Sequence, residues 1–340
     1  MCNIAGYVGC QRAAPLLLDM LEREEGLAGG YYTGVATIHK GRLHYRKVVG
    51  DTATLRCTTD AEDLPGTIGL AHSRSNSGGD REWGHPFVAC GDQLAYIANG
   101  SGGQWKDDPR RQAGAQRLAD AGHRFSSAHQ GAIGSYPMLN DGTCVHMSDA
   151  MAHGIEAALA RSGDPGQAIR EAFLDMPSEI VGLFITVDHA DRIVGARWNL
   201  PACAARDDQG TYIASTPQAF PGPPAWWTWV PPSSVFTVTR ECLSLASLDS
   251  PDQAILDDID RAHARQVVLA ALTEAPQSYG ELGKRVATLS PRSELIVHCD
   301  PAYEVLWDLQ REGLVRCRTK RVRGAEPELT APKFIFERAL

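Results

Sequence analysis

The amino-acid sequence predicts a layered α+β fold followed by a small helical domain that ends in two strands. In the first 249 residues, short apolar segments bounded by turn residues come in pairs, with helical segments between the pairs. This order differs from the regular strand–helix alternation of a doubly wound parallel sheet. After Asp249 the pattern changes to three helical segments and then two strand-like segments. Since 340 residues suffice for about two domains, we assign residues 1–249 to the first and 250–340 to the second.

The first domain opens with a predicted buried strand over Asn3–Val8. A helix follows over Ala13–Arg23, because Leu17, Leu18 and Leu21 recur at helical spacing. Short apolar segments then predict strands over Gly34–His39, Arg42–Val49, Thr67–His72, Leu94–Ala98, Ile180–Asp188, Ile193–Arg197, Tyr212–Ser215 and Ser234–Val238. Helical periodicity predicts helices over Arg111–Ala121 and Asp149–Arg161.

A tryptophan-rich segment over Trp226–Trp229 lies between two proline clusters, at 221–224 and 231–232. Because proline stiffens a chain and cannot continue a central strand, we expect a surface connection with partly packed tryptophans. The alternative is a hydrophobic docking loop for a partner protein.

The second domain has the element order of a winged helix–turn–helix. The sequence predicts helices over Ala254–Thr273, Tyr279–Leu289 and Ala302–Glu312, then strands over Leu314–Val322 and Lys333–Arg338. Gly313 is a typical helix stop. We therefore predict a small winged-helix-like domain.

The first of these two C-terminal strands is basic, since it carries Arg316, Arg318, Lys320, Arg321 and Arg323. Such a strand can bind nucleic-acid phosphates, or it can be a solvated edge strand that resists pairing with other chains. The preceding helix is acidic, which suits a DNA groove poorly. We therefore favour protein docking or structural support over nucleic-acid binding.

Composition excludes several broad classes of protein. A net charge of −8 and 43% apolar residues exclude a wholly disordered chain and disfavour a globally basic nucleic-acid coat. The nine cysteines are scattered without a CxxC pair, so we predict no disulfide framework and no zinc site, and we expect a reducing cytoplasm. The sequence shows no signal peptide, no membrane-spanning stretch and no metal or cofactor motif.

Cys2 is the most informative single residue. It follows the initiator methionine, and cysteine is small enough for Met1 to be removed. Removal would place a thiol and a free α-amine on one residue. Since the α-amine has an ordinary pKa of about 7.7–8.0, it could act as the base for its own thiol near neutral pH. The apolar residues after Cys2 would hold this terminus in a strand.

An ordered series of motifs resembles the class II glutamine amidotransferases, particularly the glutaminase domain of glutamine–fructose-6-phosphate aminotransferase. The opening Met1-Cys2-Asn3-Ile4-Ala5-Gly6 is followed by Gly69-Leu70-Ala71-His72-Ser73-Arg74, His85-Pro86, Ala98-Asn99-Gly100, Met147-Ser148-Asp149 and Ile213-Ala214-Ser215. The resemblance covers residues 1–249. It implies an N-terminal-nucleophile hydrolase fold, in which two antiparallel sheets lie between helical layers in the order αββα.

The resemblance also implies roles for individual residues. Cys2 would be the nucleophile, and Asn99 and Gly100 would form the oxyanion hole. Arg74 would bind the α-carboxylate of glutamine, Asp149 would pair with its α-ammonium group, and Ser77 would add a hydrogen bond. Two of the binding residues also have a plain structural interpretation: Arg74 could form an ion pair, and Asp149 could cap a helix or lie in its first turn.

The sequence departs from the family pattern at three places. Ala28 stands where the family commonly has an arginine, and the loop after Arg74 lacks the usual tryptophan and histidine. Extra chain lies between Asn99 and Asp149, notably over Ala128–Cys144. These departures affect glutamine specificity and loop closure.

Three functions follow from the sequence. We expect an enzyme that hydrolyses the glutamine side-chain amide to glutamate and ammonia, without a cofactor. The roughly ninety residues after the first domain are too few for the family's sugar-phosphate module, so the ammonia acceptor would be a separate synthase subunit. The alternatives are a hydrolase of another γ-glutamyl or acyl amide, and a catalytically silent scaffold that acts through its tail.

Overall fold

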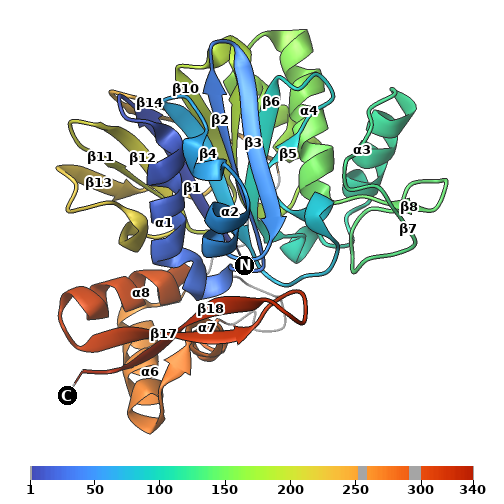
Figure 1. Cartoon of the computed structure of the whole chain (residues 1–340). Helices are drawn as coiled ribbons and strands as arrows, with labels where there is room; N and C mark the ends of the chain where they lie inside the picture. The colour runs from blue at the N-terminus through green and yellow to red at the C-terminus, as the bar shows by residue number, and fades with distance from the viewer. Residues whose placement is uncertain (1, 252–258, 291–299, 340) are drawn as a thin grey trace.

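The computed structural model describes residues 2–251, 259–290 and 300–339 (Figure 1). Two large antiparallel sheets form the centre of the molecule. The first has the strand order β13-β11-β12-β1-β4-β2-β3 and the second β15-β14-β10-β9-β6-β5. Their strands are β1 (Asn3–Gly9), β2 (Tyr32–His39), β3 (Arg42–Val49), β4 (Ile68–Arg74), β5 (Phe87–Val88), β6 (Leu94–Ser101), β9 (Glu179–Thr186), β10 (Arg192–Arg197), β11 (Cys203–Arg206), β12 (Gly210–Ala214), β13 (Trp226–Trp229), β14 (Ser234–Thr239) and β15 (Leu243–Ser247).

Helices cover the outer faces of both sheets. The helices of this part are α1 (Ala13–Ala28), α2 (Thr52–Thr58), α3 (Pro109–Asp120), α4 (Met147–Ser162) and α5 (Pro165–Asp175). A core that includes Leu17 and Leu21 lies between α1 and the first sheet. Another, which includes Met151 and Phe173, lies between the second sheet and helices α4 and α5. The sheets pack on each other through a third core, so the layers follow the order αββα.

Strand β1 shows how alternation in the sequence builds these layers. Ile4 and Val8 point into the core between the two sheets, whereas Ala5 and Tyr7 point toward α1. This period of two is that of a strand buried on both faces. Strands β12 and β4 flank β1 on either side, so Cys2 lies at the end of a central strand.

The C-terminal residues form a smaller unit with its own core. Its elements are α6 (Arg261–Glu274), β16 (Gln277–Ser278), α7 (Tyr279–Ala287), α8 (Asp300–Arg311), β17 (Val315–Arg323) and β18 (Thr330–Arg338), and its sheet has the order β16-β18-β17. The predicted helix over Ala254–Thr273 lies partly outside the described residues. Gly313 ends α8 in a left-handed conformation with φ of 72°, as its position predicted.

This C-terminal unit packs against α1 of the larger part (Figure 1). Phe334 of β18 packs directly on Gly26 of α1. A Cβ added to Gly26 would lie only 2.2 Å from the Phe334 ring, so no larger residue fits there. Arg321 of β17 forms an ion pair with Asp51, the N-cap of α2, at 2.6 Å. Asp51 is only 1% exposed, so this ion pair joins the C-terminal unit to a buried carboxylate of the larger part.

Some elements differ from the sequence prediction. Trp226–Trp229 is strand β13, paired with β11 at the edge of the first sheet, and not an irregular connection. The flanking prolines end this strand without interrupting it, which an edge position allows. Helix α5 and strands β11 and β15 were not predicted. Among the described residues, no helix is long and apolar enough to cross a membrane.

Candidate active site

A pocket of about 290 Å³ opens at the end of the sheet sandwich beside Cys2. Four of the six predicted site residues line it: Cys2, Arg74, Ser77 and Gly100. Asn99 lies directly behind this wall with its side chain fully buried. The strands that carry these residues come from both sheets, because β1 and β4 belong to the first and β6 to the second.

The backbone nitrogen of Cys2 donates a hydrogen bond to Asn99 Oδ1 at 2.7 Å. The Cys2 side chain is 7% exposed, and its Sγ lies 3.8 Å from Ser75 Oγ. Burial is the largest single influence and raises the pKa of this thiol, but interactions with His72, the N-terminal charge and the Ser75 backbone together outweigh it and lower the pKa of Cys2 to about 6. A thiol with this pKa is largely ionised at neutral pH, which is the state that a nucleophile requires.

His72 bridges the two sheets beside the thiol. Its Nε2 lies 2.9 Å from the carbonyl oxygen of Ala98 on β6. A carbonyl oxygen can only accept a hydrogen bond, so Nε2 is the donor. Nδ1 has no hydrogen-bond partner among the described residues. The sequence motif contains His72, but no role had been predicted for it.

The two polar atoms of the Asn99 side-chain amide have different surroundings. Its Oδ1 accepts from Cys2, whereas its buried Nδ2 has no hydrogen-bond partner among the described residues. A buried unpaired donor is unfavourable unless a ligand uses it. Gly100 has a φ of +136°, and an added Cβ would lie 2.0 Å from the carbonyl oxygen of Glu179. Glycine is therefore required there, within strand β6 and not in a turn.

Arg74 brings positive charge to the pocket wall. It is 1% exposed, its Nη1 donates to the carbonyl of Gly78 at 2.8 Å, and its guanidinium lies 4.9 Å from the Tyr32 ring centre. Nη2 is buried with no hydrogen-bond partner among the described residues. A buried guanidinium with a free donor is suited to a carboxylate ligand. Ser77 lies in the loop that follows.

Asp149 does not line the pocket. It is fully buried, and its Oδ2 accepts hydrogen bonds from Ser127 N and Oγ, both at 2.8 Å, and from Ser126 Oγ at 3.2 Å. Its Oδ1 lies 3.4 Å from His153 Nε2. These contacts direct the carboxylate away from the pocket, whose lining among the described residues contains no aspartate or glutamate. Pairing with a substrate ammonium group stays a prediction, and this arrangement does not favour it.

Several lining residues were not predicted. His85 and His146 lie against the pocket, and burial holds the pKa of each well below the ordinary histidine value, so both are neutral at pH 7. The extra chain over Ala128–Cys144 contributes Gly134, Ser135 and Tyr136 to the wall. The His85-Pro86 motif drew attention to His85. No local sequence pattern predicts that His146, Gly134, Ser135 and Tyr136 line the pocket.

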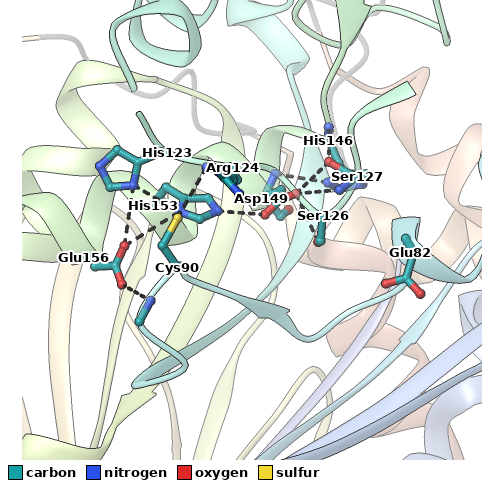
Figure 2. Close-up of polar contacts among 12 residues, drawn as sticks. Glu82, Cys90, His123, Arg124, Ser126, Ser127, His146, Asp149, His153 and Glu156 are labelled. Carbon is teal, nitrogen blue, oxygen red and sulfur yellow. Dashed lines mark hydrogen bonds and ion pairs between the residues drawn. The ribbon is translucent and has the colours of Figure 1, made fainter. Parts of the chain in front are cut away.

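A group of side chains that could hold a metal lies outside this pocket. The ligand atoms of Cys90, His123, His153 and Glu156 all lie within 4.8 Å of one another (Figure 2). The sequence gave no sign of this group, because its members come from three separate segments.

Comparison with known proteins supports the resemblance. No model of a known protein family matches the sequence. The glutamine–fructose-6-phosphate aminotransferase of Mesorhizobium japonicum is 28% identical over 220 residues, which covers 63% of this chain and 32% of that protein. The corresponding enzyme of Caldanaerobacter subterraneus is 33% identical over 102 residues, 29% of this chain and 17% of that protein.

Solved structures show the same fold. Glutamine phosphoribosylpyrophosphate amidotransferase from B. subtilis superposes with a TM-score of 0.59 at 15% identity, covering 91% of this chain and 64% of that one. The chain is therefore similar to the class II glutamine amidotransferases in the sequence of its first domain and in fold. Its αββα sandwich has the layer order that this resemblance predicts. The chain spans only about a third of the length of the curated aminotransferase relatives that it matches.

Proposed function

We propose that the chain is a glutaminase that hydrolyses the glutamine side-chain amide through N-terminal Cys2, once Met1 has been removed. The hydrogen bond from the Cys2 nitrogen to Asn99 Oδ1 carries this proposal. It holds the nitrogen beside the thiol and leaves Asn99 Nδ2 free to donate to a developing oxyanion. Asn99 thereby positions the base, which is the α-amine of Cys2, and also stabilises the transition state.

The reaction follows from these positions. The α-amine of Cys2 takes the thiol proton, and the thiolate attacks the amide carbon of glutamine. Asn99 Nδ2 and the Gly100 N–H donate to the tetrahedral oxyanion. The intermediate collapses as the α-ammonium group returns its proton to the departing nitrogen, which releases ammonia and leaves a γ-glutamyl thioester. Water then attacks the thioester, which gives glutamate and regenerates the thiol.

The substrate is held through its carboxylate. Nη2 of Arg74 supplies a free buried donor, and Ser77 lies on the same wall. Charge-assisted hydrogen bonds of this kind contribute about 1.5–3 kcal/mol each. Arg74 is therefore the main determinant of carboxylate binding in the proposed complex.

We further propose that residues 1–249 form the glutaminase domain and that 250–340 form a winged-helix-like docking domain. Three basic residues of its strand β17 have acidic partners, since Arg316 and Arg318 pair with Glu337 and Arg321 pairs with Asp51. These contacts favour structural support over nucleic-acid binding. The ammonia would pass to a separate synthase subunit.

A second candidate is hydrolysis of a different amide, one without a free α-amine. The position of Asp149 favours this candidate, because its carboxylate is held by Ser126 and Ser127, away from the pocket. Such a substrate would still offer a carboxylate to Arg74. γ-Glutamyl compounds with a blocked amine belong to this class.

An intact-mass measurement combined with a glutaminase assay tests the proposal. The expected mass lacks Met1, and processed protein is expected to release one glutamate and one ammonia per glutamine consumed. N-Acetylglutamine serves as the competing substrate. A higher kcat/KM for N-acetylglutamine would favour the second candidate, and active protein that retains Met1 would contradict the mechanism.

A further inference from the structure

A second cluster of reactive side chains is joined to the active-site wall through Asp149. It consists of Cys90 in the turn between β5 and β6, His123 after α3, and His153 and Glu156 on α4. Figure 2 shows the four side chains converging on one point, with Asp149 between His153 and Ser127. The proposed hydrolysis does not use this cluster.

Four of the six separations among the ligand atoms are close to the edges of a metal-centred tetrahedron, and all six lie within 4.8 Å. His153 Nδ1 lies 3.2 Å from His123 Nδ1 and 3.5 Å from Cys90 Sγ. Glu156 Oε2 lies 3.5 Å from His123 Nδ1 and 3.8 Å from His153 Nδ1. Zinc bonds of about 2.0–2.3 Å in tetrahedral geometry place neighbouring ligand atoms about 3.3–3.7 Å apart. The side chains therefore need little rearrangement to bind an ion.

Neighbouring groups hold two of the ligands in a binding orientation. Gly91 N donates to Glu156 Oε1 at 3.0 Å, which leaves Oε2 directed at both histidines. Arg124 N donates to Cys90 Sγ at 3.3 Å, a contact that stabilises a thiolate.

His153 is oriented in the way that metal-binding histidines usually are. Its Nδ1 faces the cluster, whereas its Nε2 faces Asp149 Oδ1 at 3.4 Å. A carboxylate on the second ring nitrogen fixes the tautomer and strengthens the ligand. Asp149 is in turn held by Ser127, whose Oγ also accepts from the backbone nitrogen of His146 in the pocket wall. The cluster thus connects to the active site through the His153–Asp149 ion pair and the hydrogen bonds of Ser127.

We propose that Cys90, His123, His153 and Glu156 form a tetrahedral site for one zinc-class divalent ion. A thiolate, two imidazoles and a carboxylate are ligands that Zn²⁺ and Co²⁺ accept, and four protein ligands are typical of a structural site. The ion would tie the β5–β6 turn and the chain after α3 to α4. Cys90 is exposed and His123 half-buried, so the ion has a path from solvent.

Cobalt spectroscopy tests this site directly. Full-length protein without a polyhistidine tag is stripped with a chelator and titrated with Co²⁺, in a Cys2→Ala background that removes the active-site thiol. We expect one Co²⁺ per chain, with the intense visible bands of a tetrahedral ion and a thiolate-to-cobalt charge-transfer band. One equivalent of Zn²⁺ should displace the cobalt.

Variants assign the signal to the cluster. Cys90→Ser should abolish the charge-transfer band, and His123→Ala should weaken Co²⁺ binding at least tenfold. Asp149→Asn keeps all four ligands and should weaken binding about 10–100-fold, since it removes only the orienting carboxylate. Cys57→Ser and His44→Ala replace an exposed thiol and a half-buried imidazole outside the cluster, and should leave both spectrum and affinity unchanged.

Two outcomes would overturn the proposal. One is the lack of stoichiometric binding in stripped protein whose circular dichroism shows it to be folded. The other is a spectrum and affinity that persist in Cys90→Ser and His123→Ala, which would assign the ion to other groups. Because Cys90 and His123 are on the surface side of the cluster, replacing them tests binding without opening the core.

Discussion

The Cys2 nitrogen and Asn99 Oδ1, 97 positions apart in the chain, lie 2.7 Å from each other. Cys2 precedes β1 in the first sheet, and Asn99 is on β6 in the second. The hydrogen bond therefore forms only when the two sheets are packed together. It fixes the direction of the Asn99 amide, so that Nδ2 is the group left without a hydrogen-bond partner among the described residues.

Replacing Cys2 with alanine should abolish glutamate release, because the nucleophile is lost while the backbone bond to Asn99 stays. The measurement is glutamate formation, with the melting temperature as a check that the fold is intact. Cys10→Ser, which replaces an exposed thiol, serves as the matched control and should keep full activity. Undiminished turnover by Cys2→Ala would refute the mechanism.

Two substitutions at Asn99 separate its tasks. Asn99→Asp keeps an oxygen for the Cys2 nitrogen but replaces the Nδ2 donor with a second oxygen, whereas Asn99→Ala removes both groups. Loss of an oxyanion donor lowers kcat by about 10²–10³-fold. We expect at least this loss in Asn99→Asp, with KM little changed. Equal kcat values for Asn99→Asp and the parent protein would show that Nδ2 does not meet the oxyanion.

The activity should rise with pH through a midpoint near 6, the pKa of Cys2. Below this pH the thiol is protonated and inactive, and above it the thiolate predominates. In His72→Gln the largest influence that lowers this pKa is lost while burial stays, so the midpoint should move to higher pH, and the thiolate fraction at pH 7 should fall. The pH dependence of kcat/KM and of Cys2 alkylation measures both. A midpoint unchanged from that of a His44→Gln control would contradict the assignment to His72.

Arg74→Lys should raise KM about 10–100-fold with a smaller effect on kcat, because an ammonium group cannot replace the planar donor pair. The variant keeps the positive charge in a buried position. Steady-state kinetics with glutamine provide the measurement, and Arg42→Lys, on the exposed side of β3, is the control. A parental KM in Arg74→Lys would place the substrate carboxylate elsewhere.

Arg321→Ala should reduce the free energy of unfolding by about 1–3 kcal/mol, because it leaves the buried Asp51 carboxylate without its cation. Arg321 is half exposed, so the effect should fall below that of a fully buried pair. Urea unfolding measures the loss. Arg323→Ala, on the same strand and exposed, should change stability by less than about 0.5 kcal/mol. Equal effects of the two substitutions would show that the ion pair does not stabilise the docked arrangement.

Local pattern was enough to predict much of the fold. Strand β1, the hairpin of β2 and β3, and helix α4 lie close to their predicted bounds, because alternation and helical periodicity are properties of neighbouring residues. The partly packed tryptophans of Trp226–Trp229 were predicted correctly. The predicted surface connection is instead strand β13, because only pairing with β11 makes this segment a strand. The extra chain over 128–144 has no strong periodicity, so its place against the pocket could not be predicted.

The sequence by itself predicted the candidate nucleophile, the asparagine–glycine pair and the arginine, since each lies in a short motif whose order along the chain carries the information. Only the tertiary structure decided what those groups contact. It placed Asn99 Oδ1 on the Cys2 nitrogen, set His72 beside the thiol, and directed Asp149 away from the pocket toward His153. It also gathered Cys90, His123, His153 and Glu156 from segments that share no sequence pattern. Contacts between distant segments depend on how the sheets and helices pack, and a one-dimensional pattern does not record that packing.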